Sequence, residues 1–306
     1  MARTRFPPDR GLASRMLITM FLLGLLYVVF VAILLAVSSS AIFALVVAGG
    51  LLAVQYFASD RIALAAMGAK EVSPQQEPHL HGAVDRLCAL ADMPKPRVAI
   101  AEADIPNAFA TGRSPDKAVV CVTRGLLRRL DEPELEAVLA HELSHVAHRD
   151  VAVMTIASFL GLAAGLVVRF AFYAGMFGGG FGGRRDDRDN GVPVVLVIIV
   201  ISAVVYGISF LLTRALSRYR ELSADRAAAA VTGRPSTLAS ALVKVSGEMS
   251  KIPTRDLRGV ESLNAFFFTP ALAKGFSLSS LFSTHPSLER RLEQLARIEA
   301  ESGPAA

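Results

Sequence analysis

The sequence predicts a mainly α-helical membrane protein with four transmembrane helices and a cytoplasmic α+β domain that contains a small sheet. Three observations lead to this fold class: the apolar composition, four long apolar segments, and basic residues that gather on one side of these segments. Of the 306 residues, 53% are hydrophobic, and the mean hydropathy is positive. A soluble domain is usually less apolar than this, so the composition favours an integral membrane protein.

Four apolar segments are long enough to cross a bilayer, which requires about 20 residues. They cover residues 16–37, 41–58, 151–176 and 192–213. The first segment is too long for a signal peptide, and the second follows it directly after a turn of three serines. We therefore expect the first segment to be retained as a membrane anchor.

Arginines and lysines border the spans mainly on one side: before the first, after the second, before the third and after the fourth. The positive-inside rule then predicts a multi-pass protein of the inner or plasma membrane, with a cytoplasmic N-terminus and cytoplasmic soluble parts. One loop disagrees, because Arg184, Arg185 and Arg188 lie on the predicted far side. The net charge of +5 is explained by this topology, and no basic-aromatic pattern suggests a nucleic-acid partner.

These spans divide the chain into four predicted parts. Residues 1–59 form an N-terminal tail and a transmembrane hairpin, and residues 151–213 form a second hairpin. The cytoplasmic parts are 60–150, with a helix at 78–90 and strands at 97–101, 108–111 and 118–123, and 214–306, with helices at 235–250 and 286–300. Cys88 and Cys121 lie in apolar periodic segments, so we expect small core residues and no disulfide.

Residues 141–145 form an HExxH motif on a predicted helix. The helix begins at 131–134 with a cap residue, a proline and acidic side chains, which suit the positive end of the helix dipole. Four residues of helix bring His141 and His145 onto one face, about 6 Å apart along the axis, so that two neutral imidazoles can bind one zinc ion. Glu142 lies between them and is placed to act as a general base.

A catalytic zinc site usually has three protein ligands and one open position. The metzincin arrangement would place a third histidine at residue 151, which is Val151, and His148 lies about 10 Å along the axis from His141. Glu221 and Asp225 are four residues apart on a helix that continues from the fourth span. Glu221 can be the third ligand and Asp225 can support a histidine; the alternative is a charged surface face with ion pairs.

Topology brings the two motifs together. Two spans separate His145 from Glu221, and two crossings return the chain to the side on which it started. Each motif also adjoins its span. A transmembrane hairpin would therefore hold both motif helices side by side at the membrane surface.

With these motifs, the chain resembles the HtpX family of integral-membrane zinc metallopeptidases, which are related to the CAAX prenyl endopeptidases. The shared motifs occur in the family order: residues 107–112 (NAFATG), 141–145 with Asp150, 220–221 with 224–225, and 285–286 with Arg291. Two positions depart from the family pattern, His148 in place of a common Asn and Leu222 in place of an aromatic residue.

The resemblance implies a gluzincin-like metallopeptidase domain with one zinc ion per chain, held by His141, His145 and Glu221, and Glu142 as catalytic acid/base. It implies cytoplasmic hydrolysis of polypeptide substrates, among them membrane proteins, in protein quality control. His285 and Arg291 are candidate catalytic donors to the oxyanion; the alternatives are a turn residue and a solvated helix face. Asn107, Ala108 and Phe109 are candidate substrate-binding residues of an edge strand, or part of an ordinary hairpin.

Two other functions remain open from the sequence. A site-2-type intramembrane protease also carries HExxH, but its motif would lie within a span, whereas charged residues flank this one. A membrane scaffold with structural zinc would usually have four Cys or His ligands, and this chain offers two histidines and a carboxylate.

Overall fold

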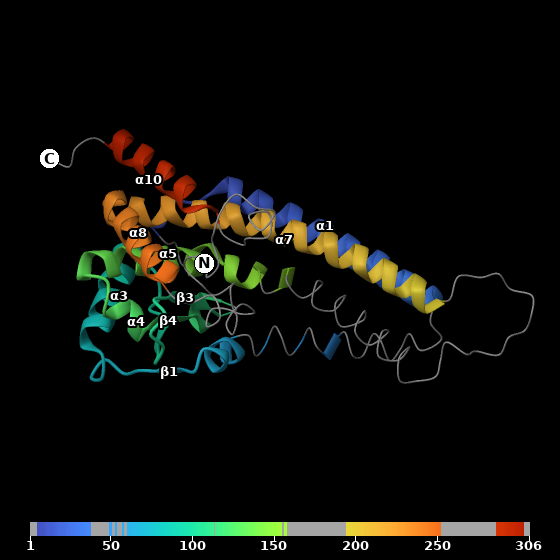
Figure 1. Ribbon diagram of the computed structural model, residues 1–306, viewed down its shortest axis with the longest axis horizontal. Helices are drawn as coiled ribbons and strands as arrows, with labels where there is room; N and C mark the ends of the chain where they lie inside the picture. Colours follow the sequence, from blue (N-terminus) through green and yellow to red (C-terminus); the bar gives the residue numbers. More distant parts are fainter. Residues whose placement is uncertain are drawn as a thin grey trace, which may run out of the picture. The chain divides into compact units, whose positions relative to one another are not determined.

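The computed structural model describes residues 5–37, 49–50, 53, 57, 60–112, 114–154, 156–157, 194–251 and 286–302. The chain divides into two compact units. One unit comprises Met1–Ala13, Phe57–Ala152 and Leu216–Ala306, and the other comprises Ser14–Tyr56 and Val153–Ala215. Figure 1 labels the helices and strands of both units.

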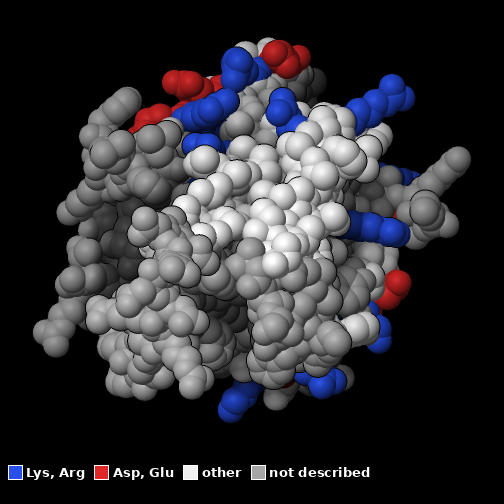
Figure 2. Space-filling view, turned by 90° about the vertical axis from the view of Figure 1, so that its right-hand side faces the viewer, with Lys and Arg blue, Asp and Glu red and all other residues white. Residues whose placement is uncertain are grey.

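Two long helices dominate the described part of the second unit. Helix α1 (Arg10–Val37) and helix α7 (Val194–Thr232) lie side by side there (Figure 1). Their contact includes Leu23 and Phe30 of α1 and Val205 of α7. Large apolar side chains are exposed on both helices, for example Leu17 and Leu211. In Figure 2, a broad area of the described surface carries neither basic nor acidic side chains.

Within the described residues, two stretches are long and apolar enough to cross a membrane, Arg10–Ile33 and Ile199–Thr232. They overlap the first and fourth predicted spans. Most of the predicted spans 41–58 and 151–176 lies outside the described residues, as do Arg184, Arg185 and Arg188.

The first unit contains a four-stranded sheet in the order β1-β2-β4-β3. Its strands are β1 (Ala69–Glu71), β2 (Arg97–Ala101), β3 (Ala108–Thr111) and β4 (Val119–Thr123). Strands β2 and β4 are parallel, and the two outer strands pair antiparallel with them. The predicted strands 97–101 and 108–111 are confirmed, and the third begins one residue later than expected. Strand β1 was not predicted, because three residues give no usable alternation.

Helices cover both faces of this sheet. Alternate residues such as Val98 and Val120 pack in the main core with α3 (Pro78–Ala91) and α5 (Glu132–His148). The opposite face, which includes Phe109 and Cys121, packs on Ala63 and Leu64 of the helical segment 60–66. Strand β3 is the edge strand on the side where α5 crosses the sheet. It ends at Gly112, where φ is +124° and an added Cβ would lie 2.6 Å from the Lys117 carbonyl oxygen.

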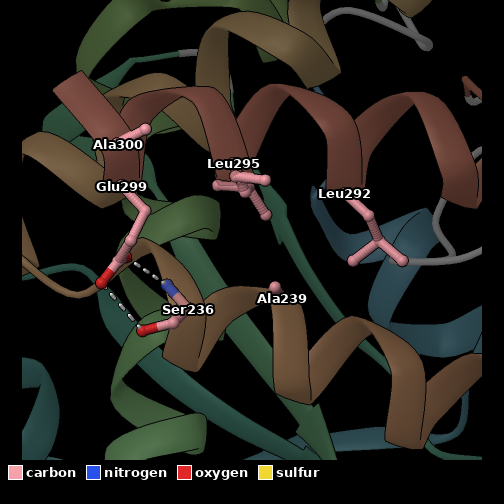
Figure 3. A pocket seen from close by; sticks show the side chains of 7 residues that line it. Ser236, Ala239, Leu292, Leu295, Glu299 and Ala300 are labelled. Carbon is pink, nitrogen blue, oxygen red and sulfur yellow. Dashed lines mark hydrogen bonds between the residues drawn. The ribbon is translucent and has the colours of Figure 1, made fainter.

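The first unit also contains a short helix next to β4, α4 (Arg124–Leu127), and, beyond it along the chain, the C-terminal part of α7 and two further helices. The C-terminal part of α7 passes α5, while α8 (Pro235–Lys251) and α10 (Leu288–Ser302) pack against each other (Figure 1). Glu299 of α10 accepts hydrogen bonds from the backbone N–H and the hydroxyl of Ser236 at the start of α8 (Figure 3). A cavity of about 560 Å³ beside this contact is lined by Ala239, Leu292 and Leu295 among others. None of its lining residues carries the HExxH chemistry.

Candidate active site

Helix α5 presents the HExxH motif from a well-defined start. Asp131 caps the helix by accepting a hydrogen bond from Glu134 N at 2.9 Å, and Glu134 accepts one from Asp131 N at 3.2 Å. This capping box confirms the helix start expected from residues 131–134. Glu134 is also held by Lys244 and Ser240 of α8, at 2.6 and 2.7 Å. The position of α5 is thus fixed from its first turn.

The structure brings His141, His145 and Glu221 together although 76 positions separate the second from the third. One ligand atom from each lies within 4.8 Å of the others. Nε2 of His141 and Nε2 of His145 each lie 3.5 Å from an oxygen of the Glu221 carboxylate. All three side chains are buried. The continuous helix α7 carries Glu221 and Asp225, as expected for a helix that extends from the fourth span.

The other nitrogen of each imidazole is bound to a carboxylate. Nδ1 of His141 lies 2.9 Å from Asp225 Oδ1, and Nδ1 of His145 lies 2.9 Å from Asp150 Oδ2. These contacts orient both rings so that Nε2 faces Glu221. The position of Asp225, four residues after Glu221, predicted this supporting role. The same role of Asp150 was not predicted, although Asp150 belongs to the motif shared with the HtpX family.

This donor set fits zinc. Two atoms bonded to one tetrahedral zinc ion at about 2.1 Å lie about 3.4 Å apart, which is close to the 3.5 Å from His141 Nε2 to Glu221 Oε2 and from His145 Nε2 to Glu221 Oε1. Two imidazoles and one carboxylate, each histidine supported by a further carboxylate, are typical of catalytic zinc sites.

Burial and neighbouring charges shift the pKa values of the cluster. Burial lowers the pKa of His145. Burial also opposes the charged form of His141, but hydrogen bonds to Asp225 and Glu221 raise its pKa to about 9. Burial raises the pKa of Glu142 to about 7, a value suited to a group that takes up and releases a proton near neutral pH.

Glu142 faces the edge strand. Its Oε2 accepts a hydrogen bond from the backbone N–H of Ala110 on β3 at 2.9 Å. The candidate base is therefore in direct contact with the backbone of the strand that carries the candidate substrate-binding residues. This contact joins α5 and β3 at the centre of the site.

The substrate-binding candidates occupy different positions on β3. Ala108 packs in the main core on the α5 side of the sheet, and Phe109 packs on the opposite face. Asn107 is buried, and its backbone N–H and C=O are hydrogen-bonded to the hydroxyl of Thr123. A polypeptide added to this edge would thus meet mainly the backbone of Ala108 and Ala110.

Of the two candidate oxyanion donors, His285 and Arg291, the structure describes only Arg291. His285 lies outside the described residues. Arg291 is buried and donates two hydrogen bonds to Asp225, at 2.8 and 2.6 Å, while its Nη2 lies 3.5 Å from Nδ1 of His141. The guanidinium thus lies on the Nδ1 side of His141. Arg220 contacts the Glu221 carboxylate, with its Nη2 3.3 Å from Oε1.

Comparison with known proteins identifies the family. The model of peptidase family M48 matches residues 74–299. The chain is 60% identical over 303 residues to Protease HtpX homolog 1 of Streptomyces coelicolor, covering 99% of this chain and 98% of that protein. It is 54% identical over 301 residues to the Protease HtpX homolog of Moorella thermoacetica, covering 98% of each.

A solved structure supports the fold. The crystal structure of Ste24p from S. mikatae aligns with a TM-score of 0.51 at 15% identity, covering 94% of this chain and 67% of that chain. A fold shared at this low identity agrees with the mostly helical architecture and the small mixed sheet.

The fold and the buried histidine-carboxylate cluster define a membrane metalloprotease. The chain belongs to peptidase family M48, and the resemblance to the HtpX family is confirmed. The scaffold and site-2-type alternatives are not favoured by these relationships.

Proposed function

We propose that the chain is a zinc endopeptidase that hydrolyses membrane or misfolded proteins at the cytoplasmic face of the membrane, in protein quality control. His141, His145 and Glu221 hold one zinc ion, and Glu142 is the catalytic acid/base. The observation that carries this proposal is the convergence of Glu221 with the two imidazoles at a spacing that suits tetrahedral zinc.

When bound, zinc supplies a Lewis acid that polarises the scissile carbonyl and lowers the pKa of a water molecule to about 7. Glu142 takes the proton from the attacking water and passes it to the leaving amine. Its burial supports this role, because burial raises the pKa of the Glu142 carboxyl and so favours its uptake of a proton. Asp225 and Asp150 hold the imidazoles in a fixed orientation throughout the reaction.

Strand β3 is the proposed binding site for the substrate backbone. An extended polypeptide can add to a sheet edge through main-chain hydrogen bonds. Ala110 N–H already contacts Glu142, so a substrate strand at this edge would pass beside the catalytic base. Recognition through the backbone suits a protease that acts on varied polypeptides.

The proposed membrane topology brings the two soluble parts of the chain to the same side of the membrane. Four spans with a cytoplasmic N-terminus place both halves of the active site on one side, as the positive-inside pattern predicts. His285 is proposed as a donor to the oxyanion. We assign Arg291 to the support of Asp225, because it donates two short hydrogen bonds to that carboxylate, from Nε and from Nη2.

Proteolysis by the purified full-length chain tests this function. In detergent, the protein is expected to cleave a denatured protein substrate, to lose activity with a chelator and to regain it when zinc is added. The same preparation carrying Glu142→Gln controls for contaminating proteases. Cleavage that survives both chelation and Glu142→Gln would contradict the proposal.

A further inference from the structure

The first described residues of the chain contact both α5 and α7, the two helices that carry the proposed metal ligands. Residues 5–12, here called the N-terminal clasp, begin at the end of α3, where Arg5 N donates to Ala91 O at 2.6 Å. Phe6 is 3% exposed and packs in the main core. His148, the last residue of α5, lies with Nε2 3.2 Å from Pro7 O. The clasp is therefore anchored to α5 three residues beyond His145.

Asp9 anchors the clasp to α7. Its Oδ2 accepts hydrogen bonds from the Ser223 hydroxyl and from Arg226 Nη2, both at 2.6 Å. Its Oδ1 accepts from Leu12 N at 2.8 Å and so caps the first turn of α1. Partial burial opposes ionisation, but the hydrogen bonds from Ser223, Leu12 and Arg226 lower the pKa of Asp9 to about 2. The carboxylate is thus charged at neutral pH.

Gly11 allows the N-terminal clasp and α7 to approach each other closely. A Cβ at this position would collide with the Tyr219 hydroxyl and lie 3.3 Å from its ring carbon Cζ. The Tyr219 hydroxyl also lies 3.5 Å from Asp9 Oδ1. Glycine in the first turn of α1 therefore lets Asp9 reach the surface of α7.

The clasp binds the face of α7 that lies opposite the metal ligand. At about 100° per residue, Ser223 lies about 160° and Arg226 about 140° around the helix from Glu221. The same turns of α7 thus contact α5 through Glu221 and the clasp through Ser223 and Arg226. Gln294 of α10 adds a third contact, donating to Leu222 O at 2.7 Å.

We propose that the N-terminal clasp sets the position of Glu221 relative to His141 and His145, with Asp9 as the positioning residue. The clasp connects the end of α5 directly to α7, which otherwise are far apart along the chain. Metal ligands must be held within about 0.5 Å of their productive geometry, so such a link affects metal binding. It also gives a role to His148, which departs from the family pattern. The inference rests on the zinc centre proposed above.

Three variants test the clasp in the full-length protein in detergent. Asp9→Ala removes every Asp9 contact. Asp9→Asn keeps one oxygen, which can accept either from Leu12 N or from Ser223, and it loses the charge that faces Arg226. Asp85→Asn is the matched control, because it breaks the ion pair of Asp85 with Lys95, 2.8 Å apart at the surface.

Zinc affinity, measured by competition with a chelator, and the kcat and KM for a peptide are the readouts. Asp9→Ala is expected to weaken zinc binding by up to about tenfold, the lower limit for groups that contact a metal ligand directly, because Asp9 acts through Ser223 and Arg226 of α7. It is expected to lower kcat at partial zinc loading with little change in KM. Asp9→Asn should fall between Asp9→Ala and the parent, and Asp85→Asn should match the parent.

His148→Ala and His148→Gln give an independent test if Asp9→Ala does not fold. The alanine variant is expected to weaken zinc binding, and glutamine, whose amide nitrogen reaches about as far as Nε2 of histidine and can donate to Pro7 O, is expected to restore it. Parent-like zinc affinity in folded Asp9→Asn and His148→Ala, with only a lower Tm, would show a merely structural clasp and overturn the inference. A parent protein that binds no zinc would instead overturn the proposed function.

Discussion

Arg291 donates two hydrogen bonds to Asp225, from Nε to Oδ2 at 2.8 Å and from Nη2 to Oδ1 at 2.6 Å. Both side chains are buried. Asp225 in turn contacts Nδ1 of His141 at 2.9 Å, so a chain of charged groups runs from α10 through α7 to the HExxH helix. Burial disfavours a charged Asp225, but Arg291 holds the pKa of its carboxyl below the usual range.

Arg291→Met should leave Asp225 as a buried carboxylate without its cation. Removal of one partner from a buried pair typically costs about 3–5 kcal/mol, so we expect a large drop in thermal stability and weaker zinc binding. Thermal unfolding in detergent and chelator competition measure the two effects. Arg290→Met changes an exposed neighbour and should lower neither the thermal stability nor the zinc affinity. If Arg291→Met matches Arg290→Met, the pair has no supporting role.

Glu142→Gln should abolish most hydrolysis while zinc stays bound. Glutamine has nearly the same shape and retains an oxygen that can accept from Ala110 N–H, but it cannot take a proton from water. General acid-base groups contribute about 10²–10⁴-fold, and we expect kcat to fall by that range. Metal analysis and peptide hydrolysis measure both properties. Glu136→Gln, on the same helix and paired with Arg86, is the control; equal rates in the two variants would exclude Glu142 as the base.

The local part of this site could be predicted from the sequence. The HExxH helix was recognisable because its cap, its first turn and its two histidines are encoded within 18 consecutive residues, 131–148. Glu221 was predictable for a different reason: the predicted membrane spans, if the chain crosses twice between His145 and Glu221, return it to the same side and so limit which distant segments can meet. Strands β2 and β3 followed from short apolar runs bounded by turn residues.

The missing parts depend on tertiary contacts. The contact of Asp150 with His145 does not follow from helical spacing, because α5 ends before Asp150: Arg149 has a left-handed conformation with φ of 57° and changes the direction of the chain. Arg291 lies on an amphipathic helix whose charged residues look alike in sequence, yet one of them is buried. The clasp was missed because residues 5–12 contain no periodic pattern, and their partners lie in α3, α5 and α7.

Glu221→Ala should lose zinc, because two imidazoles alone make a weak and poorly oriented site. We expect metal content well below one zinc per chain after dialysis, together with loss of hydrolysis. Asp225→Ala should bind zinc more weakly than the parent but more tightly than Glu221→Ala, since Asp225 acts through His141. Full zinc occupancy in Glu221→Ala would exclude this residue as a ligand.

Zinc binding should release protons. In the metal-free protein the pKa of His141 is raised to about 9, so the imidazole is protonated near pH 7.5, whereas zinc binds only the neutral form. Affinity should therefore increase as pH rises from about 6, by up to about tenfold per pH unit for one proton, and level off above about 9. Calorimetry in two buffers with different ionisation enthalpies measures the number of protons released.

Asp225→Asn tests whether the protons released on zinc binding come from His141. The amide lacks one of the two carboxylate charges that raise the pKa of His141, the other being that of Glu221, so the metal-free imidazole should be protonated to a smaller extent near pH 7.5. The variant should then release fewer protons on binding zinc, even though its affinity is lower. Equal proton release in the parent and in Asp225→Asn, or zinc affinity that does not change between about pH 6 and 9, would contradict a protonated His141 in the metal-free site.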